Sequence, residues 1–203
     1  MRWGTAAGLV ALCSLLPGLA AAQPSDADKI EAARLAREAE QHGNRNELRE
    51  ALRKFKAAAV LDPTTPAYLC NIGLAYYGLS DFARAHLNLS RCYQATGKWP
   101  AGVQDVYNFV EDELARRDFA PVSITGVPED AKISLKEYEG EGELRAPLKV
   151  YLAPGNYIYE ASLPGYKPWL GEIRVLDRKS LNEQYRLLAA DATAPAGGDT
   201  VGD

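Results

Sequence analysis

Histidine and cysteine are scarce in this chain, and their scarcity limits the catalytic and metal-binding sites that it can form. The 203 residues include two histidines, His42 and His86, and three cysteines. Neither histidine stands at the spacing from a cysteine that a zinc site requires. A glycine-rich phosphate loop and a nucleophile elbow are also missing, which argues against nucleotide-binding and hydrolase sites. We therefore expect a protein without enzymatic activity, catalytic residues, metal ion or cofactor.

Long hydrophobic runs are also rare, and the clearest one stands at the N-terminus. Arg2 precedes an almost wholly apolar run over Ala6–Leu16, and Ala20–Ala22 then supplies the small residues that a signal peptidase recognises. The alternative is a membrane anchor, but the run is shorter than the roughly 20 residues that a transmembrane helix needs. We expect a signal peptide over residues 1–22, with cleavage before Gln23. The mature protein would then be periplasmic or secreted, without a membrane span.

The three cysteines have different expected roles. Cys13 raises the alternative of a lipoprotein, but Leu12 precedes it where a lipobox has a small residue, so we expect Cys13 to leave with the signal peptide. Cys70 and Cys92 remain, on the two arms of one expected helical hairpin. An even number of cysteines in an exported protein permits a disulfide. Two free, buried cysteines that fill tight helix contacts are the alternative, and we favour it over the disulfide.

The charge balance argues against nucleic acid as a partner. The formal net charge is −4 at pH 7, and the basic residues are interleaved with acidic ones along the chain. A surface for nucleic acid or anionic lipid would need a basic cluster, and the sequence contains none that stands out. No such partner is expected.

The first half of the chain has the apolar spacing and the breaks of a series of helices. Ser25 offers an N-cap, and Pro63 and Pro66 separate one helix from the next. The last segment carries apolar residues at the i, i+3, i+4 and i+7 spacing of an amphipathic helix. The expected helices are Ala27–Gln41, Glu47–Leu61, Ala67–Gly78, Phe82–Ala95 and Ala101–Arg117.

These helices repeat with a period of 34 residues. Ala51 aligns with Ala85, and Phe55 with Leu89, so that small and large apolar residues recur at fixed offsets. Such a period is typical of stacked helical hairpins, which leave an extended surface free to bind other molecules. The alternative, an unrelated helical bundle, does not explain this register.

The segment Asn71–Tyr77, followed by Asp81-Phe82 and Ala85, resembles a tetratricopeptide repeat. The resemblance implies that the first helix of each repeat lines a groove that binds a protein or peptide. The implied lining residues are Glu40, Asn71, Leu74, Tyr77, Gln104 and Asn108. Family members that bind a carboxylate tail use lysine, arginine and asparagine there, and this set has no lysine or arginine. We therefore expect an apolar or helical peptide in the groove rather than a carboxylate; packing or plain exposure of these residues is the alternative.

After Asp118 the helical pattern gives way to short stretches of alternating apolar and polar residues. Proline and glycine separate these stretches, as at Pro154-Gly155-Asn156. Six strands in this short span indicate a small antiparallel β-sandwich. The expected strands are Val122–Thr125, Ala131–Leu135, Leu148–Leu152, Tyr157–Ala161, Gly171–Val175 and Glu183–Leu187.

Four landmarks in this half resemble those of a PEGA domain, a short β-module of bacterial surface proteins. They are Pro128–Ala131, in which Asp130 replaces a glycine, Ala146-Pro147, Ala153–Tyr157 and Leu163–Tyr166. The replacement is mild, because aspartate tolerates the left-handed conformation better than most residues. The resemblance implies a protein of the cell envelope, with wall polymer or polysaccharide among its expected ligands. Trp169 is the residue of this half that we expect to make a contact, since an exposed aromatic ring can stack on a sugar or a peptide.

Together these observations predict an α+β protein with two domains. A signal peptide (1–22) precedes a tetratricopeptide-like helical domain (23–118), a PEGA-like β-sandwich (119–188) and a flexible tail (189–203). The predicted function is a non-enzymatic envelope scaffold or adaptor that binds a protein or peptide in its helical groove. The alternative is a peptidoglycan- or polysaccharide-binding module in which the β-domain is responsible for recognition.

Overall fold

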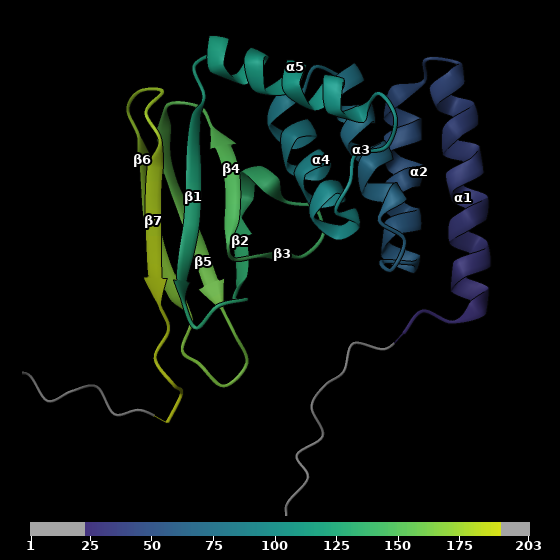
Figure 1. Ribbon diagram of the computed structural model, residues 1–203. Coiled ribbons are helices and arrows are strands. Elements are labelled where there is room, and N and C mark those ends of the chain that lie inside the picture. Colours follow the sequence, from purple (N-terminus) through teal and green to yellow (C-terminus); the bar gives the residue numbers. More distant parts are fainter. Residues whose placement is uncertain (1–22, 192–203) are drawn as a thin grey trace, which may run out of the picture.

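The structure is a computed structural model that describes residues 23–191. Five helices are followed by seven strands, so the predicted α+β class is confirmed (Figure 1). The predicted signal peptide (1–22) and residues 192–203 of the predicted tail lie outside the described residues. Within residues 23–191, no helix is long and apolar enough to cross a bilayer.

The helical half consists of two hairpins and a fifth helix. Its elements are α1 (Asp26–Asn44), α2 (Leu48–Leu61), α3 (Ala67–Gly78), α4 (Phe82–Thr96) and α5 (Val103–Arg116). α1 packs on α2 and α3 packs on α4, while contacts between α2 and α3 join the two hairpins. α5 lies across α4 and α3 and contacts both (Figure 1). All five expected helices are therefore present, with ends shifted by a few residues at most.

Polar side chains and one glycine fix where helices begin and end. The Ser25 hydroxyl accepts a hydrogen bond from the Asp28 backbone N–H, and the Asp28 carboxylate accepts one from the Ser25 backbone N–H. This reciprocal pair is a capping box, so the expected Ser25 N-cap is confirmed. Asp81 caps α4 by accepting from the Arg84 backbone N–H at 3.2 Å. α4 ends at Gly97, whose φ of 67° lies in the left-handed region that favours glycine.

The second hairpin depends on a small residue where its helices meet. A Cβ atom at Gly73 of α3 would lie 2.6 Å from the Cγ atom of Leu89 on α4 and 3.0 Å from the Leu89 backbone nitrogen, so a larger residue would push the two helices apart. Ala85, on the same side of α4, is completely buried. Small residues at these two positions let α3 and α4 touch, as the 34-residue register suggests.

The β half consists of two sheets packed face to face. Its strands are β1 (Ala120–Val127), β2 (Lys132–Leu135), β3 (Leu144–Arg145), β4 (Leu148–Leu152), β5 (Gly155–Ser162), β6 (Trp169–Val175) and β7 (Leu181–Arg186). One sheet has the order β4-β1-β7 and the other has the order β3-β2-β5-β6. Ala120, Val122 and Ile124 alternate along β1 and are completely buried, which is the period of two that a half-buried strand requires.

The predicted small antiparallel β-sandwich is confirmed as the class of this half, but the structure differs from the prediction in two details. β3 is an additional strand of two residues, and β7 runs parallel to β1. Val122 pairs with Leu181 near one end of this parallel pair, and Val127 pairs with Arg186 at the other. Alternation along a strand shows which side chains are buried but not which strand lies beside it, so the sequence did not specify the direction of β7.

The β half also extends beyond its predicted end at residue 188. The Ala190 backbone N–H donates to the Gly165 carbonyl at 2.9 Å, and Ala189 pairs with Tyr166. The first residues of the predicted flexible tail are therefore part of the fold. The hydrogen bonds that hold them are between backbone groups, which every residue type carries, so the composition of the segment did not indicate this pairing.

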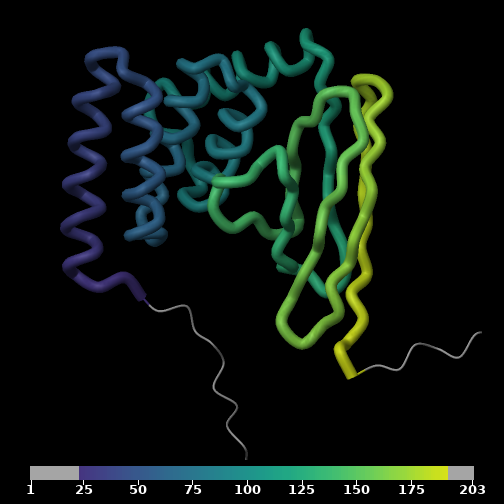
Figure 2. Tube along the Cα trace, turned by 180° about the vertical axis from the view of Figure 1, so that it is seen from behind, coloured from purple at the N-terminus to yellow at the C-terminus, as the bar shows by residue number. Residues whose placement is uncertain are grey.

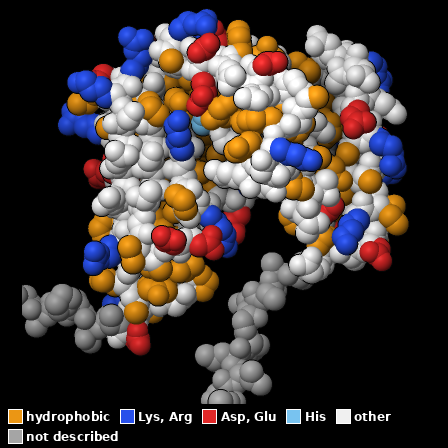
Figure 3. Space-filling model, in the orientation of Figure 1, with side chains coloured by type: hydrophobic (Ala, Val, Ile, Leu, Met, Phe, Trp, Pro, Cys, Tyr) orange, Lys and Arg blue, Asp and Glu red, His pale blue; other side chains and the backbone are white. Residues whose placement is uncertain are grey.

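The two halves form an arch with a hollow between its lower ends (Figure 3). Each half contributes side chains to the apolar core of the other. Leu87 of α4 is 1% exposed and is buried among the residues of the sandwich core. In return, Tyr151 of β4 and Phe119, just before β1, pack on the helical core. Each half buries side chains of the other, so packing fixes their relative orientation.

Candidate functional site

Three of the predicted groove residues lie on one face of α3. Asn71, Leu74 and Tyr77 follow one another at intervals of three residues, and all three are half-buried. The Tyr77 ring lies 5.7 Å from the ring of Phe109 on α5 and 6.4 Å from the ring of Phe82 on α4. Aromatic contacts therefore bring this face of α3 to α5.

α5 adds two predicted residues and one that the sequence analysis missed. Gln104 and Asn108 are exposed, and Phe109, beside Asn108, is 42% exposed. Phe109 was missed because the other apolar residues of α5 already complete its amphipathic pattern. An aromatic residue outside the amphipathic pattern of a helix is the feature of the sequence that could have identified it. Leu74, Tyr77, Asn108 and Phe109 are called the α3–α5 face below.

The remaining predicted contact residues lie elsewhere. Glu40 is exposed near the end of α1, which packs on α2 rather than on α3. Trp169 begins β6 in the β half, where it pairs with Ala161 of β5 and is 40% exposed. The structure does not bring either residue to the α3–α5 face, so the predicted groove is reduced to α3 and α5.

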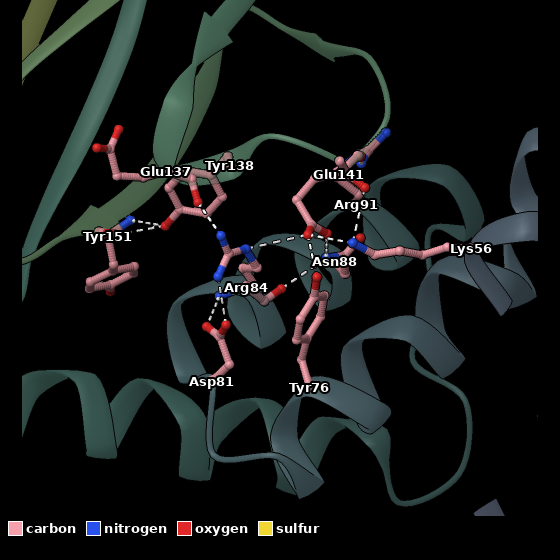
Figure 4. A network of polar contacts seen from close by, with 11 residues as sticks. Lys56, Tyr76, Asp81, Arg84, Asn88, Arg91, Glu137, Tyr138, Glu141 and Tyr151 are labelled. Atoms are coloured by element: carbon pink, nitrogen blue, oxygen red, sulfur yellow. Dashed lines mark hydrogen bonds and ion pairs between the residues drawn. The ribbon is translucent and has the colours of Figure 1, made fainter. Parts of the chain in front are cut away.

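A second site, which the sequence analysis also missed, joins the two halves. The segment between β2 and β3 leaves the sandwich and reaches the helices, as Figure 2 shows from behind. At its tip the side chain of Glu141 is completely buried. Donors from three helices surround this carboxylate (Figure 4): Lys56 of α2, Tyr76 of α3, and Arg84 and Asn88 of α4. These four residues are called the Glu141 socket.

The geometry of the socket satisfies both carboxylate oxygens. Lys56 Nζ lies 2.8 Å from Oε1 and the Tyr76 hydroxyl donates to the same oxygen, while Arg84 Nε lies 3.4 Å from it. Asn88 Nδ2 donates to Oε2 at 2.8 Å. Burial, and then the hydrogen bond to Glu141, raise the pKa of Tyr76 above its usual value. A buried carboxylate is stable only when it is paired and hydrogen-bonded in this way.

The backbone of the same loop is held as well as its side chain. Arg91 of α4 donates to the carbonyl oxygens of Glu141 at 2.6 Å and Glu143 at 3.1 Å. Arg84 donates to the carbonyl of Glu137 at 2.6 Å, and Lys56 to that of Gly140 at 3.0 Å. Basic side chains of the helical half therefore donate hydrogen bonds to backbone carbonyls along the whole loop.

The socket is separate from the predicted groove. The groove was not expected to bind a carboxylate, because its predicted lining residues contain no lysine or arginine, and that expectation stays a prediction. The helical half does bind a carboxylate, but with residues of α2, α3 and α4 outside that lining. The carboxylate belongs to the chain itself. Glu141 stands between two glycines in an acidic stretch, a pattern that on its own indicates an exposed turn.

His86 occupies a buried position where α4 meets α5 and β4. It is 1% exposed, and its Nε2 lies 2.9 Å from the Tyr107 hydroxyl, which donates to Glu111 at 3.0 Å. The Tyr107 hydroxyl has a single proton, and it donates this proton to the Glu111 carboxylate, so it can only accept from His86. Nε2 of the neutral imidazole therefore carries the proton and donates to Tyr107. Burial, and then the nearby charge of Lys149, lower the pKa of His86 to about 4. Nδ1 is then a buried acceptor without a partner among the described residues.

Cys70 and Cys92 form a disulfide between α3 and α4. Their Cα atoms are 5.1 Å apart, within the range that a bridge requires. The structure therefore has the bridged arrangement rather than the free thiols that we favoured from the sequence. The two helices touch closely at Gly73, which brings the cysteine backbones within bonding range.

Comparison with known proteins identifies the β half. Residues 119–190 match the family model of the PEGA domain. In the turn after Pro128, Asp130 has a φ of 65°, the left-handed conformation expected where the family has glycine. The match does not extend to the helical half, whose tetratricopeptide resemblance stays a prediction. No curated protein matches the chain significantly.

Proposed function

With a PEGA domain at residues 119–190 as the premise, we propose that this protein is a non-enzymatic, exported scaffold of the cell envelope. The helical half is a short tetratricopeptide array that holds a segment of a partner protein. The PEGA domain presents this array within the envelope. The absence of a recognisable catalytic constellation in the sequence supports a binding role.

The observation that carries this proposal is the α3–α5 face. Phe109 is 42% exposed, and its ring stands edge-on to the ring of Tyr77 at 5.7 Å. Leu74 adds an aliphatic side chain one turn away on α3, and Asn108 supplies a polar group at the margin. An uncharged aromatic and aliphatic surface of this kind suits the apolar side of an amphipathic helix. We therefore expect the partner to present a helix.

A scaffold must hold its binding surface in a fixed orientation, and two features support this property. Leu87 is buried in the sandwich core, and the Glu141 socket ties the β2–β3 segment to three helices. Together they make the α3–α5 face a rigid extension of the PEGA domain.

The proposed export has support from the disulfide. Bridges persist in oxidising compartments such as the periplasm and are rare in the cytosol. N-terminal sequencing of the protein from the periplasmic or secreted fraction should give Gln23 as the first residue. A protein that stays in the cytosol and begins at Met1 would contradict export.

Capture by the full chain tests the binding proposal. The immobilised protein is incubated with an envelope extract of its native cell, and retained proteins are identified by mass spectrometry. Phe109→Glu places a charge in the α3–α5 face and should abolish retention of the partner. Val60→Glu is the matched control, because Val60 is 79% exposed on α2, away from that face. Equal retention by wild type and Phe109→Glu would refute the proposal.

A second candidate function is recognition of wall polymer by the β half. Trp169, 40% exposed at the start of β6, favours it, since such a ring can stack on sugar. Sedimentation of the full chain with insoluble peptidoglycan is the assay. Trp169→Ala should reduce the sedimented fraction, and Leu176→Ala, at a 73% exposed position, should not. If both variants sediment like the wild type, Trp169 is not the recognition residue.

A further inference from the structure

A cleft separates the two halves on the side of α4 that faces β3 and β4. Its volume is about 590 Å³, within the range of small-molecule sites, which often lie between domains. α4, the loop after it and the start of α5 form one wall, and β3, β4 and the turn between them form the other. Hydrophobic side chains gather on this face of the molecule below α5 (Figure 3).

Three aromatic rings line the helical wall of the cleft. Tyr93 stacks on Trp99 with ring centroids 4.7 Å apart and an angle of 27° between the planes. Trp99 in turn lies 4.8 Å from the ring of Tyr107. Tyr93 is at the outer end of this row and is 43% exposed. Its open face can stack on the C–H face of a sugar ring.

The rim of the cleft carries three basic side chains, Arg91, Arg145 and Lys149, and one acidic residue, Glu143. Two carboxylates beside the cleft pair with the same basic groups: Asp130 with Arg145 at 3.1 Å and Glu111 with Lys149. Arg145 donates to Glu143 at 2.8 Å, so these two charges largely offset each other. Lys149 is held most loosely, 3.8 Å from Glu111 with its side chain 48% exposed. Its ammonium group also lies 5.3 Å from the centre of the Tyr151 ring, and of the basic groups at the rim it is the one that an anion can most easily draw away from its present partner.

Uncharged polar groups stand between the rings and the rim. Ser90 and Gln94 line the cleft, and so does His86, whose Nδ1 is buried without a partner among the described residues. The Ser90 hydroxyl and the Gln94 amide can therefore bond to ligand hydroxyls, whereas Nδ1 of His86 is too deeply buried to contact a ligand.

We propose that this cleft binds an acidic sugar. The sugar ring stacks on Tyr93, its hydroxyls bond to Ser90 and Gln94, and its carboxylate pairs with Lys149. The site is built from both halves and shares no residue with the α3–α5 face. It therefore goes beyond the scaffold function, and either can fail without the other.

Matched pairs of acidic and neutral sugars test this proposal on the full chain. Methyl glucuronide has a carboxylate where methyl glucoside has a CH2OH group, and N-acetylmuramic acid differs from N-acetylglucosamine by a lactyl ether that carries the carboxylate. Calorimetry and amide chemical shifts should show saturable binding of at least one acid, with its neutral partner about tenfold weaker. The shifts should fall on α4 and β4. The second pair distinguishes a wall-derived sugar from a simple hexuronic acid.

Three variants assign the contacts. Lys149→Gln should weaken binding of the acid about tenfold and leave the neutral sugar unchanged. Tyr93→Ala should weaken both sugars by about 5- to 10-fold, because the stacking platform is lost. Lys179→Gln is the matched control, since Lys179 is 86% exposed and lies outside the cleft. All three positions are exposed enough that the fold should survive, and unchanged urea midpoints verify this.

Four outcomes would overturn the proposal. They are no saturable binding of either acid at about 10 mM, equal binding of acid and neutral sugar, no effect of Lys149→Gln, and tighter binding of triglutamate than of either acidic sugar. The last would assign the cleft to an acidic peptide instead.

Discussion

Replacing Glu141 with glutamine should destabilise the whole protein, although the residue lies in a loop. The substitution keeps the size of the side chain and removes its charge. One acceptor oxygen then becomes an NH2 group that points at donors. Lys56, Tyr76, Arg84 and Asn88 all direct N–H or O–H groups at the present carboxylate.

The magnitude follows from the exposure of each partner. Tyr76 and Asn88 are buried, and a lost hydrogen bond to a charged group costs about 1.5–3 kcal/mol. The side chains of Lys56 and Arg84 are 28% and 32% exposed, so water replaces much of what they lose, and each contributes less than about 1 kcal/mol. Because glutamine retains one acceptor, we expect a total loss of about 3 kcal/mol. For a chain of this size that lowers Tm by about 6–12 °C.

Urea unfolding measures this loss, and the fluorescence of two tryptophans shows whether both halves are destabilised. Trp99 reports on the helical half and Trp169 on the β half, while circular dichroism at 222 nm follows the helices. Transitions seen by all three should coincide, since the halves share buried side chains. Glu139→Gln is the matched control, because Glu139 is exposed in the same loop. It should leave the midpoint unchanged.

A double variant tests whether the loss arises in the socket. Tyr76→Phe combined with Glu141→Gln should cost less than the sum of the single changes, because both remove the same hydrogen bond. If Glu141→Gln shifts the urea midpoint no more than Glu139→Gln does, the socket does not stabilise the fold and the reasoning fails.

Three further predictions concern the buried histidine, the shared core and the disulfide. The pKa of His86 in the folded protein, about 4, lies below its ordinary value of 6.5, so the unfolded chain takes up a proton first as the pH falls. The free energy of unfolding should therefore lose none of the His86 contribution above about pH 6.5 and decrease by about 3 kcal/mol as the pH drops toward 4. His86→Gln should flatten the pH dependence of the urea midpoint, and an unchanged slope would contradict this. Leu87→Ala should cost about 2–5 kcal/mol by leaving a cavity in the sandwich core, whereas Val60→Ala, at a 79% exposed position, should have little effect in the same assay. Replacing both Cys70 and Cys92 with alanine should cost about 3 kcal/mol, from the chain entropy of the loop that they close; a Tm that responds neither to this change nor to reductant would show that the bridge is absent in solution.

The helical half was largely predictable from the sequence because its signals are local. Pro63 and Pro66 separate α2 from α3, and Ser25 caps α1, so each boundary depends on residues beside it. The 34-residue register also placed Gly73 correctly at a close helix contact. The strands were recognised for the same reason, since alternation is read within a few residues.

The features that were missed depend on residues far apart in the chain. β7 lies beside β1 through pairing of Val122 with Leu181, which no local pattern specifies. The Glu141 socket joins positions 56 and 141, and the acidic stretch around Glu141 has the composition of a solvated turn. Phe109 was assigned no role because its exposure depends on how α5 crosses α3 and α4. In each case local chemistry leaves several tertiary arrangements open, and long-range packing selects one.

Leu87 has a consequence for how this PEGA domain can be cut or recombined. The family match begins at residue 119, yet the sandwich core includes a side chain from α4, outside that boundary. A fragment excised at the family limits would expose apolar side chains where Leu87 now sits, and it should aggregate or stay partly unfolded. Grafting the fragment onto another protein would leave the same defect. In this protein the smallest portable unit of the PEGA domain therefore includes α4, and exchange of domains between proteins would have to move the two together.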